Sequence, residues 1–137
     1  MRTNFQIQDF REINFEGRLI DLHNNFLFQG FHVDLANTRV TLFWLKSTGE
    51  WIMPSELEKV TIMHEGVDYF KVLPASQAMS DADSQTLSEV SFFPSNEREE
   101  DRRFMDQNLP GEDDDIIYSF IGNQVIRIGC QEATLLK

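Results

Sequence analysis

Apolar residues recur along most of the chain in short runs that are separated by turn-forming pieces. Runs rich in Val, Ile, Phe, Thr and Trp occupy residues 26–35, 39–46, 57–65 and 67–73. Such runs are typical of β-strands. Because parallel neighbours need a crossover of a dozen or more residues, strands joined this closely must pair mostly antiparallel.

The C-terminal part continues the same pattern. A short run at residues 90–94 ends at Pro94, and residues 115–130 form two apolar runs around Gly122-Asn123, where positive φ angles are easily adopted. The sequence therefore predicts an α+β, mainly antiparallel β-sheet domain. We expect a meander of about seven strands, as a curved sheet or partial barrel, with one or two short helices.

The first residues fit two alternatives. Ile7, Phe10 and Ile13 are spaced by three, and Gly17 is a stop signal, so the pattern predicts a short helix. Alternation with a period of two through Phe5 and Ile7 favours a strand instead.

A second helix is predicted at residues 95–107. Asn96 is a suitable N-cap, Glu99 stands at the capping-box position, and Glu99 can pair with Arg103 one turn later. The segment has few large apolar residues, so it can bury little.

The size and composition fit one domain over residues 1–137. The chain has 137 residues, is 41% hydrophobic and contains twelve phenylalanines, which supply a core. Residues 74–88 and 95–115 are expected to be polar, mobile excursions from it. The core is expected to comprise alternate positions of the central strands: Phe31, Val33, Leu42, Trp44, Val60, Ile62, Phe70 and Val72.

The negative charge is concentrated in one part of the chain. The net charge is −11, and residues 76–115 hold twelve acidic and three basic residues, which is −9. Such a chain repels phosphate backbones and anionic lipid, so no nucleic acid or membrane partner is expected. A basic protein partner would fit, although acidity that only keeps the chain soluble is the alternative. The acidic residues expected to contact a partner are Glu99, Glu100, Glu112, Asp113, Asp114 and Asp115.

Histidines near aspartates raise the question of a metal site. His23, His32 and Asp34 are the candidate ligands, with Asp21 nearby in sequence. No His-x-His or HExxH spacing occurs, and a catalytic zinc usually needs three well-placed protein ligands. We therefore expect no metal and no cofactor, with His23 bonding backbone groups at a turn. The alternative is a small metal- or ligand-dependent enzyme that uses His32 and Asp34, with His64 beside them.

Other sources of chemistry are weak. Residues 106–117 match an EF-hand loop in part, but Pro110 and Ile117 stand where two oxygen donors belong. The single cysteine, Cys130, excludes an internal disulfide and is expected to be a buried, inert thiol. Nucleophile-elbow, phosphate-loop and dinucleotide-binding motifs are all missing from the sequence, so we expect a protein that is not an enzyme.

Residues 15–73 carry a family resemblance. The pattern "F.G..IDLHNNFLFQGFHVD", with "LEKVTIMHEGVDYFKV" later in the chain, resembles the small β-rich immunity proteins of bacterial polymorphic toxin systems. It departs where His23 is followed by Asn24 rather than Asp. The resemblance implies a cytoplasmic binder that neutralises a toxin, and an acidic chain would complement a basic one. The sequence has no signal-peptide or membrane-spanning run. A homo-oligomer paired through edge strands is a further alternative.

Overall fold

The computed structural model describes residues 1–75 and 80–136, and these residues form twelve strands in three sheets. The five-stranded sheet has the order β1 (Arg2–Thr3), β12 (Glu132–Leu136), β7 (Lys59–Glu65), β6 (Arg39–Lys46) and β5 (Phe26–Asp34). The four-stranded sheet has the order β8 (Tyr69–Leu73), β11 (Val125–Gly129), β10 (Asp114–Phe120) and β9 (Leu87–Pro94). The small sheet contains β2 (Gln6–Gln8), β3 (Glu12–Phe15) and β4 (Arg18–Asp21). Strand β1 pairs with β12 in parallel, and the other pairs are antiparallel.

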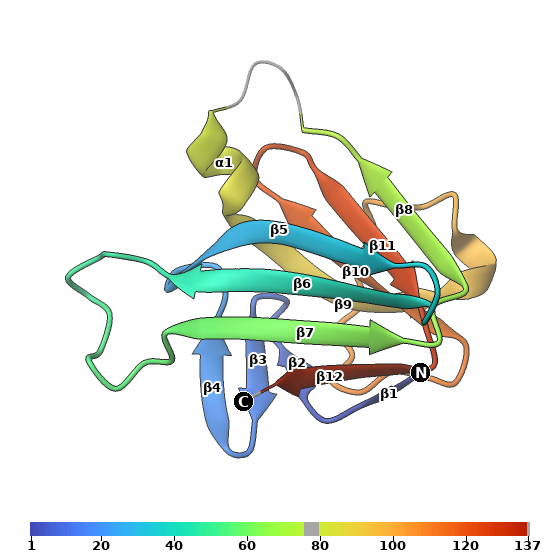
Figure 1. Cartoon of the computed structure of the whole chain (residues 1–137), viewed down its shortest axis with the longest axis horizontal. Helices are drawn as coiled ribbons and strands as arrows, with labels where there is room; N and C mark the ends of the chain where they lie inside the picture. Colours follow the sequence, from blue (N-terminus) through green and yellow to red (C-terminus); the bar gives the residue numbers. More distant parts are fainter. Residues whose placement is uncertain (76–79, 137) are drawn as a thin grey trace.

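The two larger sheets enclose the core, and their strands run in clearly different directions (Figure 1). Trp44 of β6 and Tyr118 of β10 meet between them with ring centroids 5.8 Å apart. Phe28 of β5 packs against the Trp44 ring at 5.1 Å. One hydrophobic cluster includes residues of all three sheets. Each sheet is thus stabilised mainly by burial of its inner face.

The prediction of a mainly antiparallel β protein is confirmed, but the predicted number and order of strands are wrong. All seven expected strands are present, as β5 to β11. The meander ends after β7, because the chain turns at Gly66 into the other sheet, where β8 pairs with β11. Strand β12 takes the place beside β7. Short strands at both ends of the chain account for the larger total.

The predicted N-terminal helix is wrong, and the alternation of period two is confirmed. Phe5 and Ile7 are buried, whereas Phe10 lies in a turn with φ of 61°. Strands β3 and β4 are joined by Glu16 and Gly17, both with positive φ, which is the backbone of a tight hairpin turn. Gly17 therefore closes a hairpin rather than a helix.

A β-bulge at Gln29 changes the facing of β5. Phe28 lies opposite Trp44 and Gly30 lies opposite Phe43, so Gln29 is the extra residue. Gly30 has φ of 137°, which a side chain would strain. The bulge puts Phe28 and Phe31 on the same face, although the simple alternation assigned them to opposite faces.

The predicted core is confirmed in part. Leu42, Trp44, Val60 and Ile62 are fully buried, as expected. The other four predicted core residues remain partly or substantially exposed: Phe31, Val33, Phe70 and Val72. These four lie on β5 and β8, each of which is an edge strand and has a neighbouring strand on one side only.

The predicted helix at residues 95–107 is also wrong. Only a single 3-10 turn, η1 (Ser95–Glu97), forms there. Too few apolar side chains are available to bury a helix face, and Arg98 is drawn into an ion pair with the sheet. The other polar segment contains α1 (Asp81–Gln85), which is capped by Ser80, while its residues 76–79 lie outside the described part of the chain.

Within residues 1–75 and 80–136, no helix is long and apolar enough to cross a membrane.

Candidate functional site

A network of buried charges lies on the outer side of the four-stranded sheet, beneath residues 95–105. We call these residues the cover. Arg127 of β11 is fully buried, and its Nε donates to Oδ2 of Asp115 on β10 at 2.8 Å. Arg98, from the covering segment, donates to the same carboxylate through Nε and Nη2, each at 2.9 Å. This hydrogen bonding raises the pKa of Arg98. Asp115 thus binds one arginine of the sheet and one of the cover.

Further contacts tie the cover to the sheet. Arg127 donates to the carbonyl oxygens of Pro94 at 3.0 Å and Glu97 at 3.3 Å. Lys71 of β8 donates to the Asp101 carboxylate at 2.6 Å, and this bond raises the pKa of Lys71. The second Asp101 oxygen lies 3.7 Å from Nη1 of Arg127. Both ends of the segment 94–101 are therefore held by charged groups.

Apolar contacts support the same segment. Phe93, Ile117 and Val125 form a small buried cluster on this side of the sheet. The Ser91 hydroxyl accepts a hydrogen bond from the backbone N–H of Met105 at 3.0 Å. The cover is consequently fixed along its length, although it has little regular secondary structure.

The network of buried charges and the cover together form what we call the frame. Six exposed carboxylates surround this frame, and we term them the acidic surface: Glu97, Glu99, Glu100, Asp106, Glu112 and Asp113. The N–H of Ser95 donates to the carbonyl of Asp113 at 3.0 Å, so the two halves of this surface lie side by side. Arg102 and Arg103 are also exposed in the cover. Two positive charges against six negative ones leave this surface negative overall. Four of the predicted partner-binding residues belong to it: Glu99, Glu100, Glu112 and Asp113.

The other two predicted residues are placed differently. Asp114 is half-buried, and its carboxylate accepts hydrogen bonds from Gly111 at 2.6 Å and Gln107 at 2.7 Å. Asp115 is only 1% exposed. Asp115 is therefore not on the surface where a partner was expected to contact it, because β10 starts at Asp114 and the next side chain turns toward Arg127.

Each of the candidate metal ligands has different contacts. The His23 ring contacts the carbonyl of Leu87 through Nδ1 at 2.5 Å, and its backbone N–H donates to Asp21 at 3.1 Å. His32 is exposed on the outer face of the five-stranded sheet. Asp34 on the same face is held by Asn37, whose hydrogen bonds lower the pKa of Asp34. The expected backbone contact of His23 is thus present.

Among residues 1–75 and 80–136, no group of three or more His, Cys, Asp or Glu side chains is placed to hold a metal ion. That the purified chain binds no stoichiometric transition metal stays a prediction. Elemental analysis of protein prepared without added metal or a metal-binding tag checks it. About one equivalent of zinc, iron or manganese that disappears in His32→Ala would contradict it.

His64 has a role that the sequence did not indicate. It points into the core from β7, where Nδ1 lies 2.8 Å from the carbonyl of Val40 and Nε2 lies 2.9 Å from the Tyr118 hydroxyl. The carbonyl can only accept, so Nδ1 carries the proton and Nε2 accepts from Tyr118. Burial lowers the pKa of His64 to about 4. His64 cannot join His32 in one site, because the two face opposite sides of the sheet.

Cys130 lies just after β11 and is partly buried. Burial raises the pKa of its thiol to about 12. The thiol is therefore protonated at neutral pH, and a thiol in this state is a poor nucleophile.

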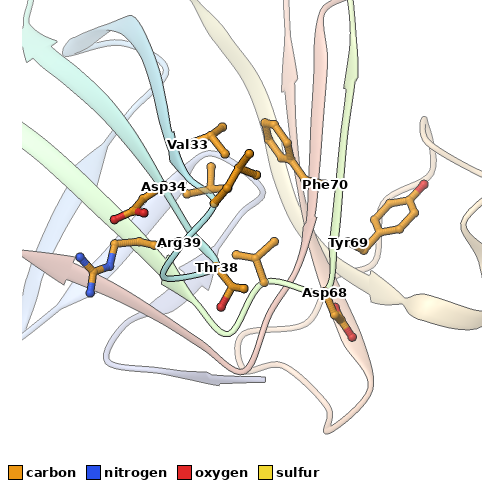
Figure 2. A pocket seen from close by; sticks show the side chains of 10 residues that line it. Val33, Asp34, Thr38, Arg39, Asp68, Tyr69 and Phe70 are labelled. Atoms are coloured by element: carbon orange, nitrogen blue, oxygen red, sulfur yellow. The ribbon is translucent and has the colours of Figure 1, made fainter.

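A pocket of about 240 Å³ opens where the β5–β6 turn meets the start of β8. In Figure 2, Val33 and Phe70 point toward each other across it, while the Arg39 guanidinium points away. Asp34 is bound to Asn37 and Arg39 is paired with Glu65 at 3.3 Å. The apolar wall and these engaged charges fit the packing of an apolar side chain better than acid–base catalysis.

Comparisons with protein-family models, with curated proteins and with solved structures find no match to this chain.

Proposed function

We propose that this chain is a cytoplasmic, non-enzymatic protein-binding domain that binds a basic partner through the acidic surface. In its more specific form, the proposal is an immunity-type protein that neutralises a toxin by binding it directly. The observation that supports the proposal is that the exposed carboxylates lie on backbone that the frame beneath them holds in place. A surface whose backbone is already ordered loses less conformational entropy when a partner binds.

The distribution of charge within the frame strengthens this proposal. Asp101 and Asp115 are neutralised by Lys71, Arg98 and Arg127. The carboxylates that face solvent therefore remain to attract a positively charged partner at long range. Exposed like charges accelerate encounter with an oppositely charged protein, and the effect weakens as salt is added.

We expect the double substitution Glu112→Gln with Asp113→Asn to slow association with a basic partner. The on-rate should fall about three- to tenfold at low ionic strength and much less at physiological salt. The melting temperature should stay nearly unchanged, because both side chains are exposed. Stopped-flow or surface-based binding to the product of the adjacent gene measures the rate.

The matched control is Asp9→Asn with Glu50→Gln, which removes the same charge from exposed positions outside the acidic surface. Its on-rate should change less than that of the first variant. Equal rates for both variants and the wild type at low salt would leave the acidity as a means of solubility only. Asp115 is omitted from the test because its loss would disturb folding.

A further inference from the structure

The outer face of the five-stranded sheet is uncovered by any other element of the described chain. Figure 1 shows β5 and β6 crossing in front of β9 and β10 of the other large sheet. Val40, Leu42 and Trp44 of β6 point inward and are buried, so Thr41, Phe43 and Leu45 point outward. The register of the neighbouring strands then identifies the outward residues of the whole sheet.

The centre of this face carries no Asp, Glu, Lys or Arg and combines apolar residues with threonines. Its outward residues are Leu27, Gly30, Thr41, Phe43, Leu45, Thr61, Met63, Thr134 and Leu136, next to His32. Phe43, Leu45 and Leu136 keep 37%, 48% and 40% of their surface exposed. Phe43 lies opposite Thr61, which in turn lies opposite Leu136, so these side chains are continuous across three strands. Contiguous exposed apolar surface of this kind commonly marks a protein interface.

Charged residues occur only at the ends of this face and cancel, as far as the described strands show. One end carries Arg2, Asp34, Arg39, Glu65 and Glu132. Arg39 pairs with Glu65 at 3.3 Å and Arg2 with Glu132 at 3.5 Å, which leaves this end at −1. The other end carries Lys59, beside Leu45, at +1. The face is thus neutral in a chain whose net charge is −11.

We propose that this face binds a second copy of the same chain to form a two-fold symmetric dimer. Two chains of charge −11 repel each other, and this neutral face is where they can approach. A two-fold axis across the strands sets β7 antiparallel to β7 of the second copy. Lys59 of each copy then lies near Glu65 of the other, so the positive end of each face meets the negative end.

The size of the face suits a weak dimer. The five strands contain 31 residues. At about 4.8 Å between strands and about 3.3 Å per residue, their face covers roughly 500 Å² per copy. The pair would bury roughly 1,000 Å², which is near the lower limit for a specific interface. We therefore expect dissociation in the micromolar range. The dimer is independent of the partner proposed above and would present two acidic surfaces.

Sedimentation equilibrium of the full chain between about 1 and about 200 µM tests the proposal. We expect the mass to rise from 16.0 kDa toward twice that value as concentration increases. Phe43→Glu should weaken dimerisation at least about tenfold, because a carboxylate would be buried in an apolar contact. Thr61→Glu serves the same purpose if the first variant does not fold. Lys59→Glu should also weaken the dimer, most clearly at low salt.

The matched control is Leu109→Glu, which makes the same change of charge at an exposed apolar residue that is not among the outward residues of this face. Its dimerisation should equal that of the wild type. A chain that remains a 16.0 kDa monomer throughout overturns the proposal. So does a dimer that Phe43→Glu and Thr61→Glu weaken no more than Leu109→Glu does, since it would use another face.

Discussion

Asp115→Ala is expected to destabilise the chain by about 3–5 kcal/mol, because it removes the carboxylate that the fully buried guanidinium of Arg127 binds at 2.8 Å. Removing the carboxylate also releases Arg98, which fixes the covering segment. A domain with a stability of 5–15 kcal/mol, which is typical, would lose a large part of it. Urea denaturation monitored by tryptophan fluorescence measures the free energy of unfolding.

Asp113→Ala is the matched control, since it removes the same side chain from an exposed position two residues away. We expect that change to stay within about 0.5 kcal/mol. A second test combines Asp115→Leu with Arg127→Met, which removes both charges at once. The double variant should be more stable than Asp115→Ala, because no unpaired charge stays buried. Equal stability of Asp115→Ala and Asp113→Ala would show that the network contributes nothing measurable.

Asp115→Ala also connects the frame with the proposed function. Without Asp115, the cover would keep the contacts of Lys71 with Asp101 and of Ser91 with Met105. The carboxylates of the acidic surface would then be carried on a less ordered segment, although their number is unchanged. Electrostatic steering depends mainly on charge, whereas the dissociation rate depends on an ordered contact.

The strands could be predicted from the sequence where local pattern and tertiary environment agree. The runs that became β6 and β7 are bounded by turn residues, and buried positions alternate with less buried ones along both strands. Their inward residues Leu42, Trp44 and Ile62 are fully buried. In β5 the bulge at Gln29 broke the alternation. A bulge adds one residue without a strong sequence signal, so the facing of Phe31 could not be derived by counting from Phe28.

The buried charged network could not be predicted from the residues around Asp115. Asp115 ends a run of four acids, and nothing local separates it from the exposed Asp113. One signal was available. Arg127 stands between Ile126 and Ile128 in an apolar hairpin strand, where a charge must find a partner to be buried. The cover that buries it could not be predicted, because its fixed path depends on tertiary contacts rather than on helix propensity.

We expect the stability of this chain to fall steeply as the pH decreases from about 6.5 toward 4, because of His64. Desolvation by full burial between the two sheets lowers the pKa of His64 to about 4, from 6.5, although its hydrogen bond to Val40 acts in the opposite direction. A histidine with a lowered pKa in the folded state contributes fully above pH 6.5 and loses its contribution below it. The loss is about 1.4 kcal/mol per pH unit, or roughly 3 kcal/mol in total.

His64→Gln should remove this slope, because its side chain does not titrate, while lowering stability at neutral pH through poorer hydrogen bonding to Val40 and Tyr118. The control His32→Gln removes an exposed histidine and should keep the slope of the wild type. Urea denaturation between pH 8 and about 5 separates this effect from the titration of ordinary carboxylates at lower pH. If the slopes of His64→Gln and the wild type coincide in that interval, His64 does not govern the acid sensitivity of the fold.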